Sequence, residues 1–200
     1  MASKKLWQNT KFLKKINDFL LENRKEVIDI ILFGSVIKGK NMPNDVDLLI
    51  LFNDKKNLEL GYELRKKLEK DLAVSVISKT YKEFFEGSFK ARDSILAEGF
   101  SLTQKKFLAE GFGYNGFILF KYELKKFNKS ERMRFYYSLL GRGEGKGLLK
   151  ETKAIKFSDM ILLCPIESEN KMSEYLNIWK INYEKFPILI PERIINLLKK

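Results

Sequence analysis

The stretch from Ile30 to Phe52 constrains the fold more than any other part of the chain. It reads IILFGSVIKGKNMPNDVDLLILF: an apolar run, the pair Gly34-Ser35, a polar spacer, and a second apolar run that opens with Asp45-Val46-Asp47. Short apolar runs bounded by turn residues predict two buried strands. Side chains alternate along a strand, so Asp45 and Asp47 should point to the same side. The sequence therefore predicts two neighbouring carboxylates close to a tight turn.

This predicted arrangement suits the binding of a metal ion and a phosphate group. Two neighbouring carboxylates repel each other unless a cation neutralises them. Mg²⁺ fits such a pair, because it takes carboxylate oxygens and completes its shell with water and substrate phosphates. We expect the Gly34-Ser35 turn to open a helix, whose first N–H groups would then face an anion. Together these features favour metal-assisted chemistry on a nucleoside triphosphate.

The same stretch resembles the nucleotidyltransferase signature of the DNA polymerase β superfamily. That signature is a hydrophobic strand, Gly-Ser, a spacer, and then Asp and hydrophobic residues in alternation; here it is met by Gly34, Ser35, Asp45, Asp47 and Leu48. Gly39 also matches a glycine that often occurs in the spacer, which is slightly shorter here than in the commonest version. The resemblance implies the mixed sheet of the nucleotidyltransferase fold, with flanking helices, over about residues 5–95.

The resemblance also implies roles for individual residues. Asp45 and Asp47 would be catalytic and would hold Mg²⁺ or Mn²⁺. Gly34, Ser35 and Lys38 would bind an NTP, for which we expect ATP, and the reaction would release pyrophosphate. Lys38 and Lys40 can reach phosphate oxygens as point charges, although a solvated loop explains these two lysines equally well.

One part of the family pattern is missing. The resemblance implies a third carboxylate on a later strand, and the available strand is LAVSVIS at residues 72–78. Its matching position holds Ser75, or Ser78 in another register. Other carboxylates that we consider as substitutes are Asp71, Glu83 and Asp93. The chain therefore either reacts through another carboxylate, reacts slowly, or binds NTP without reacting.

Two residue types exclude several kinds of site. The chain has no histidine, which rules out Ser-His-Asp and Cys-His catalysis and nearly every zinc site. Metal binding must then be oxygen-rich. The single cysteine, Cys164, lies in the apolar run MILLCP and is expected to be a buried small hydrophobe. One cysteine excludes an intramolecular disulfide and fits a reducing compartment. The basic, polar start of the chain shows no signal peptide, so we expect a cytoplasmic protein without a membrane span.

The strong positive charge is concentrated in the second half of the chain. The net charge is +12; residues 1–100 hold 19 basic and 15 acidic residues, and residues 101–200 hold 19 basic and 11 acidic residues. Such an excess suggests a polyanionic partner. Basic and aromatic residues interleave over 121–156, and the nucleic-acid-binding residues that we predict are Arg132, Arg134, Arg142 and Lys146. A core role for the aromatics and a solvated surface for the lysines is the competing interpretation.

Periodicity predicts the organisation of the rest. Amphipathic helices are expected over 8–24 and 55–70, with strands over 27–33, 46–52 and 72–78. Asn128 and Glu131 have the spacing of a capping box, and the helix that they open should end at Gly141. We expect an α/β (α+β) protein with a nucleotidyltransferase domain over 1–98. A smaller basic α+β domain over 99–200 would bind the acceptor or nucleic acid.

The predicted function is Mg²⁺-dependent transfer of a nucleoside monophosphate from an NTP to a nucleic-acid acceptor. One alternative is a degenerate nucleotidyltransferase fold that serves as a binding module, which the missing third carboxylate favours. Another is AMP transfer to a protein partner, as in toxin–antitoxin pairs, although those enzymes are usually shorter and less basic. A drug-modifying role would need an acidic pocket, which the basic second half does not suggest.

Overall fold

The protein is described by a computed structural model over residues 9–39, 45–69, 73–143 and 145–198. The chain forms two compact units, the first ending at Phe112 and the second beginning at Gly113. The boundary expected near residue 98 falls before two short strands, Phe100–Ser101 and Lys106–Phe107, which join the sheet of the first unit. The assignment of a binding function to each part of the chain stays a prediction.

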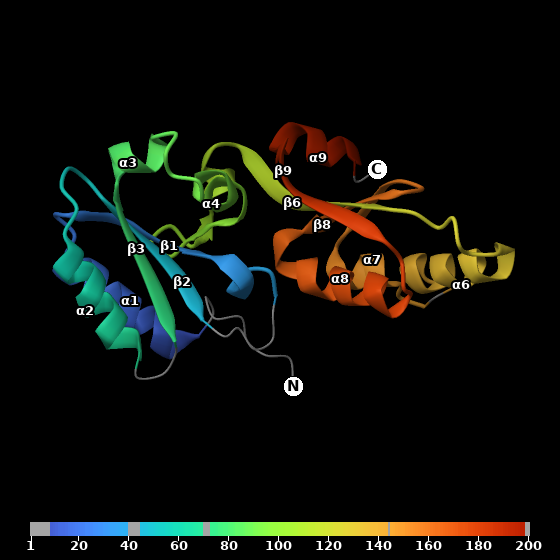
Figure 1. The fold of residues 1–200 in the computed structure, drawn as a ribbon, viewed down its shortest axis with the longest axis horizontal. Helices are drawn as coiled ribbons and strands as arrows, with labels where there is room; N and C mark the ends of the chain where they lie inside the picture. The colour runs from blue at the N-terminus through green and yellow to red at the C-terminus, as the bar shows by residue number, and fades with distance from the viewer. Residues whose placement is uncertain (1–8, 40–44, 70–72, 144, 199–200) are drawn as a thin grey trace. The chain divides into compact units, whose positions relative to one another are not determined.

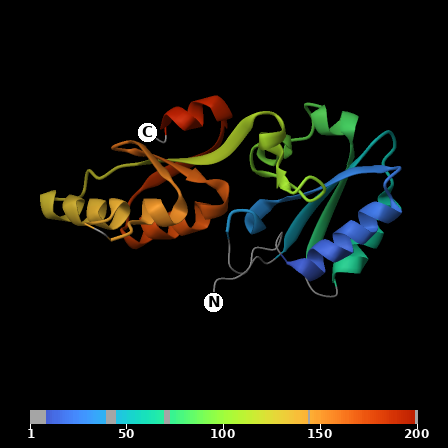
Figure 2. The same cartoon turned by 180° about the vertical axis from the view of Figure 1, so that it is seen from behind.

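The first unit contains a mixed five-stranded sheet in the order β3-β2-β1-β4-β5 (Figures 1 and 2). Its strands are β1 (Val27–Phe33), β2 (Val46–Phe52), β3 (Val74–Thr80), β4 (Phe100–Ser101) and β5 (Lys106–Phe107). β2 lies antiparallel to β1 and parallel to β3, while β4 is antiparallel to both β1 and β5. All three long strands that the sequence predicts are present, and the mixed sheet is confirmed.

Helices cover both faces of this sheet, as the apolar character of β2 predicts. Every residue of β2 except Asp47 is buried. The first unit's helices are α1 (Thr10–Glu22), α2 (Leu58–Glu69), α3 (Tyr81–Phe85), α4 (Arg92–Glu98) and α5 (Leu108–Gly111). Figures 1 and 2 show α1 and α2 side by side along one face, and these two helices are in contact. On the other face, Leu49 and Leu51 pack with Phe84 of α3 and Ile95 of α4.

The second unit contains an antiparallel four-stranded sheet in the order β7-β8-β6-β9. Its strands are β6 (Tyr114–Tyr122), β7 (Ile155–Ser158), β8 (Ile161–Pro165) and β9 (Tyr183–Pro191). Its helices are α6 (Lys129–Leu140), α7 (Leu148–Thr152), α8 (Glu169–Ile178) and α9 (Glu192–Leu198). β9 lies at one edge of this sheet and contains Pro187 and Pro191.

The helix that the capping box predicts is confirmed as α6. The Asn128 side chain accepts from the Glu131 N–H, and the Glu131 carboxylate accepts from the Asn128 N–H. Gly141 ends the helix at a φ of +96°, a value that glycine adopts without strain. Phe135 and Leu139 are fully buried, so the core interpretation of these side chains is correct. Around Phe135 stand the rings of Tyr122, Phe127, Tyr136, Tyr175 and Trp179.

Two further expectations concern burial and membranes. Cys164 is buried in β8, as expected, and burial raises the pKa of its thiol to about 12. Within the described ranges, none of the helices is long and apolar enough to cross a membrane.

Candidate active site

The Gly34 turn and Asp47 meet at one end of the first sheet. Phe33, the last residue of β1, pairs with Asp47 near the start of β2, so the turn and the carboxylate are neighbours through the strand register. Gly34 has a φ of +79°, in the left-handed region. A Cβ on residue 34 would overlap Asp47 Oδ2 and would lie 3.3 Å from Asp47 Cγ. Only glycine allows the carboxylate to lie this close to the turn.

Asp45 and Asp47 interact through space, as their alternation in the strand predicts. Asp45 is exposed immediately before β2, and Asp47 is half-buried. Partial burial, and secondarily the charge of Asp45, raise the pKa of the Asp47 carboxyl above its usual value of 3.8. Both effects disfavour a negative charge at Asp47 and both would be relieved by a bound cation. The structure therefore brings the two carboxylates together, although their catalytic and metal-binding roles stay predictions.

The segment after the Gly34 turn differs from the expected helix. Gly34–Val36 forms a single 3₁₀ turn rather than the start of an α-helix. Val36 and Ile37 are buried, which ties the turn to the core while Ser35 remains half-buried. The short turn has a physical reason: Gly34 has a φ of +79°, far from the value of an α-helix, so a regular α-helix cannot begin at this residue. The predicted phosphate contacts thus fall on a turn, with no helix dipole behind it.

Lys38 contacts a carboxylate that the sequence analysis did not single out. Its Nζ lies 3.0 Å from Oε2 of Glu98, whose side chain is only 6% exposed. Glu98 ends α4 three residues after the buried Ile95, and this position on the apolar helix face was the available signal. The ion pair gives Lys38 a structural partner, and its contact with phosphate stays a prediction. Lys40 lies outside the described residues.

The position of the missing third carboxylate is resolved by the strand register. Asp47 pairs with Ser75 across the parallel strands β2 and β3, whereas Ser78 pairs with Ile50. Paired residues on neighbouring strands point to the same face, so Ser75 holds the position nearest to Asp47. Asp71 lies outside the described residues. Among the residues that the structure describes, no group of three acidic, cysteine or histidine side chains could hold a metal ion.

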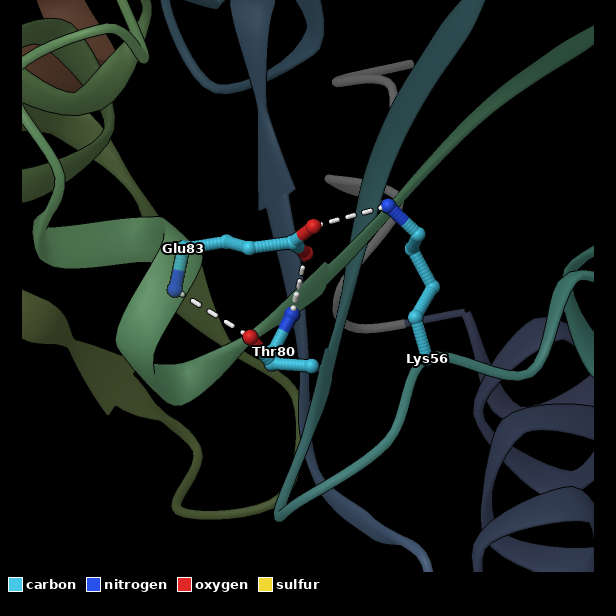
Figure 3. Close-up of polar contacts among 3 residues, drawn as sticks. All are labelled: Lys56, Thr80 and Glu83. Atoms are coloured by element: carbon cyan, nitrogen blue, oxygen red, sulfur yellow. Dashed lines mark hydrogen bonds and ion pairs between the residues drawn. The ribbon is translucent and has the colours of Figure 1, made fainter.

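Glu83 cannot replace the missing carboxylate, because it lies at the other end of the sheet. Thr80, at the end of β3, pairs with Phe52, five positions along β2 from Asp47 and thus roughly 17 Å away. Figure 3 shows that Glu83 forms a capping box with Thr80 and also binds Lys56, whose Nζ is 2.8 Å from Oε1. Asp93, the other substitute considered, is largely exposed and pairs with Arg92.

The four basic residues predicted to bind nucleic acid are all exposed in the second unit, but they do not share one face. Arg132 and Arg134 are two positions apart on α6, so they project to different sides of the helix. Arg132 Nε donates to the carbonyl of Phe127, and the Arg142 guanidinium lies over the ring of Tyr137. Lys146 lies in the loop between α6 and α7. Their role in nucleic-acid binding stays a prediction.

The glycines of the loop after α6 have a role that the sequence analysis did not foresee. A Cβ on Gly141 would overlap the carbonyl oxygen of Gly145, and a Cβ on Gly147 would overlap the backbone at Leu140 and Gly141. The loop therefore folds back onto the end of α6, with backbone packed on backbone. This close packing explains the glycines at positions 141 and 147 without a bound phosphate.

Comparison with known proteins agrees with this geometry. Residues 13–99 match the family model of the nucleotidyltransferase domain. No curated protein is significantly similar to the chain. A crystal structure of a toxin–antitoxin with AMP-PNP has 26% sequence identity, covers 45% of this chain and 71% of that chain, and gives a TM-score of 0.36. A mutant of the toxin–antitoxin MntA-HpeT gives 24% identity with the same coverage and TM-score.

TM-scores of this size do not establish a shared overall structure, and the assignment rests on the family match. The matched segment contains the Gly34 turn, both aspartates and the three long strands that carry them. The first unit of this chain therefore contains a nucleotidyltransferase domain, the family that the Gly34-Ser35 and Asp45-Val46-Asp47 pattern predicts.

Proposed function

We propose that the protein is a metal-dependent nucleotidyltransferase that transfers a nucleoside monophosphate, with ATP as donor, to a nucleic-acid acceptor. The observation that carries this proposal is the placement of the Asp47 carboxylate directly against Gly34, with Asp45 beside it. Because the turn and the carboxylate pair lie side by side, phosphate oxygens held by the turn would lie next to a cation held by the carboxylates.

The residues present fit a hard divalent cation. The donor set is two carboxylates without histidine, and the only cysteine is buried in the other unit. Asp45 and Asp47 would hold Mg²⁺ or Mn²⁺, with water and triphosphate oxygens completing the shell. When bound, the ion would neutralise charge on the triphosphate and lower the pKa of an acceptor hydroxyl.

The chain's own residues would orient the nucleotide for an in-line displacement. The acceptor hydroxyl oxygen forms a bond to the α-phosphorus while the bond to the pyrophosphate leaving group breaks. Backbone groups of Gly34 and Ser35 would hold the terminal phosphates, with the Ser35 hydroxyl as a further donor. Lys38, adjacent to this turn, would add a positive charge that it shares with Glu98.

The exposed charge of the second unit supports a nucleic-acid acceptor. Arg134, Arg142 and Lys146 are solvent-exposed, whereas the aromatic residues Tyr122 and Phe135 are buried. Buried rings cannot stack on bases, and the exposed ring of Tyr137 is already covered by the Arg142 guanidinium. We therefore propose that the contact is made to phosphates by charge. Such binding is independent of sequence and weakens with salt.

A second candidate function is an NTP-binding module that does not catalyse transfer. Ser75 favours this candidate. It stands beside Asp47, at the position where a third carboxylate would complete the site of a metal ion that binds the acceptor hydroxyl, here called the acceptor-side ion. Loss of one ligand weakens an acceptor-side ion more than an ion that the triphosphate itself also coordinates.

One experiment separates the two candidates. The full chain is incubated with α-³²P-labelled ATP, Mg²⁺ or Mn²⁺, and mixed RNA, and the label that becomes covalent is followed by gel electrophoresis. Equilibrium binding of a fluorescent ATP analogue is measured in parallel. We expect metal-dependent binding and labelled RNA, both lost in the double variant Asp45→Asn/Asp47→Asn, which removes charge while leaving packing nearly unchanged.

Each outcome has a distinct meaning. Binding without any covalent label points to the binding module, and label on protein instead of RNA points to a protein acceptor. A double variant that binds ATP and Mg²⁺ as tightly as the wild type would show that the metal site lies elsewhere. Circular dichroism of the double variant checks that the fold is intact.

A further inference from the structure

The first unit contains a pocket of about 300 Å³ that is separate from the Gly34–Asp47 site. Its lining includes Asp29 and Ile31 of β1, Leu51 of β2 and Phe84 of α3. Asp29 lies five positions before Gly34 along the chain, roughly 16 Å away in an extended strand. The volume is at the lower end of the range for small-molecule sites, about 300–1,000 Å³. The nucleotidyltransferase site does not account for this pocket.

Asp29 is the unusual group in this pocket. The residue is only 5% exposed, and its Oδ1 accepts one hydrogen bond of 3.3 Å, from the backbone N–H of Thr103. Among the described residues, no lysine or arginine forms an ion pair with Asp29. A buried carboxylate is normally paired with a cation, because its desolvation is otherwise costly. Within the part of the chain that the structure describes, the pocket therefore presents a carboxylate without a positive partner.

A β-bulge lies directly beside this carboxylate. Val27 pairs with Phe52 and Asp29 pairs with Leu51, so Ile28 is an extra residue in β1. A bulge of this kind bends the strand and re-aims the neighbouring side chains, and it is common beside functional sites. Because of it, the consecutive residues Ile28 and Asp29 both line the pocket. Asp29 faces the pocket on the same side as Ile31, two positions along the strand, and the bulge adds Ile28 to this lining.

The rest of the lining combines one cation with a largely apolar wall. Lys106 of β5 lines the same pocket and forms no ion pair with Asp29 or another acid among the residues that the structure describes. Aliphatic and aromatic groups make up most of the rest of the lining, and the rings of Tyr81 and Phe85, 4.9 Å apart, stand partly exposed. A carboxylate, an ammonium group and an apolar wall together match a small zwitterion with an apolar body.

We propose that this pocket binds an apolar or aromatic amino acid. The ligand's ammonium group pairs with Asp29, its carboxylate pairs with Lys106, and its side chain packs on Leu51, Phe84 and the two exposed rings. Charge-assisted hydrogen bonds to its ammonium and carboxylate groups fix its orientation, and the apolar wall supplies most of the contact area. The site lies outside the residues that the proposed transfer uses, so it is an additional binding site of the same unit.

Three related probes test this proposal by isothermal titration calorimetry on the full chain. Phenylalanine carries both charged groups, phenethylamine only the ammonium group, and 3-phenylpropionate only the carboxylate. We expect phenylalanine to bind at least about tenfold more tightly than either truncated probe, because each probe leaves one charge of the pocket without its partner. Methyl NMR shifts at Ile28, Ile31 and Leu51 locate the binding.

Two variants assign the charges. Asp29→Asn keeps the oxygen that accepts from Thr103 but loses the charge, and should abolish the preference for phenylalanine over 3-phenylpropionate. Lys106→Gln should abolish the preference over phenethylamine while leaving the preference over 3-phenylpropionate. Glu110→Gln, an exposed charge change on α5 outside the lining, is the matched control and should bind like the wild type.

The double variant Asp45→Asn/Asp47→Asn should bind phenylalanine normally, which separates this proposal from the nucleotide site. Absence of phenylalanine binding at millimolar concentration in a folded wild type overturns the proposal. So does equal binding of the three probes, or phenylalanine affinity that is unchanged in both Asp29→Asn and Lys106→Gln. Thermal unfolding of each variant confirms that the protein tested is folded.

Discussion

The carboxylate of Asp47 fills the space that a side chain on residue 34 would need. Gly34 satisfies two conditions at once, a φ of +79° and the absence of a Cβ in contact with Asp47 Oδ2. The first condition is common to many turns, whereas the second ties the turn to a charged group on the next strand. The conformation of the turn and the position of the carboxylate are therefore one structural unit, and a change to either residue should move both.

Gly34→Ala should weaken metal-dependent ATP binding by more than tenfold, because the new methyl group pushes the Asp47 carboxylate away. Strain at positive φ should also lower the free energy of unfolding by roughly 1 kcal/mol. Gly113→Ala is the control: Gly113 has a φ of +76°, but no atom lies within 4 Å of a Cβ there. Chemical denaturation and titration with a fluorescent ATP analogue measure both effects. Equal loss of binding in the two variants would show that the contact with Asp47 is unimportant.

Ser75→Asp should increase metal affinity and, if transfer is limited by the acceptor-side ion, the rate of transfer. The register places the new carboxylate beside Asp47, where it adds a ligand. In the absence of metal the same change should reduce stability, since three carboxylates repel one another. Thermal unfolding with and without Mn²⁺ measures this opposite response. Ser88→Asp, in an exposed turn after α3, adds the same charge and should show neither effect.

Lys38→Met should lower the free energy of unfolding by about 1–3 kcal/mol, because it removes a cation that pairs with the buried carboxylate of Glu98. The double change Lys38→Met/Glu98→Gln should restore part of this stability, as it removes both charges. ATP affinity should stay low in the double variant if Lys38 also contacts phosphate. Recovery of ATP affinity together with stability would assign Lys38 a structural role alone.

The Glu83 capping box should give a pH-dependent contribution to stability. Hydrogen bonds from Lys56 and from the Thr80 N–H lower the pKa of the Glu83 carboxyl below its usual value of 4.5. The folded state then binds the proton less readily than the unfolded state. The stabilisation is complete above pH 4.5, and it is lost as the pH falls through the lowered pKa that Glu83 has in the folded state.

Glu83→Gln keeps an acceptor for the Thr80 N–H but removes the charge. The substitution should lower the free energy of unfolding by less than about 1 kcal/mol at pH 7, since solvent screens the ion pair with Lys56. In urea denaturation, the difference in free energy of unfolding between Glu83→Gln and the wild type should shrink as the pH approaches 3. A difference that grows toward low pH would contradict this assignment.

Binding of RNA by the second unit should depend steeply on salt. Replacing Arg134, Arg142 and Lys146 with glutamine should reduce the slope of log K against log salt by about 0.7–0.9 for each phosphate that the variant no longer neutralises. Matched changes of the exposed Lys14, Lys66 and Lys82 in the first unit should leave the slope unchanged. Fluorescence anisotropy with a labelled oligonucleotide measures both. A wild type without affinity at low salt would remove the nucleic-acid acceptor from the proposed function.

Local patterns predict the parts of the structure that depend on neighbouring residues. The alternation of side chains around Asp47 predicts both the strand and the shared side of the two carboxylates. The capping-box spacing of Asn128 and Glu131 predicts the start of α6. The extra length of the first unit beyond residue 98 could not be predicted, because β4 and β5 are only two residues long each, β4 exists through pairing with β1, and β5 through pairing with β4. The Lys38–Glu98 ion pair joins residues sixty positions apart, so no local pattern reports it.

The edge strand β9 limits how copies of this protein can associate. Pro187 and Pro191 lack the N–H that a further strand would need, and Glu184 and Lys185 place charges along the same edge. A long outer strand that carries exposed Phe186 and Leu189 would otherwise be a template for continued sheet growth between molecules. The prolines interrupt that template, so this edge resists aggregation although the strand is rich in apolar residues.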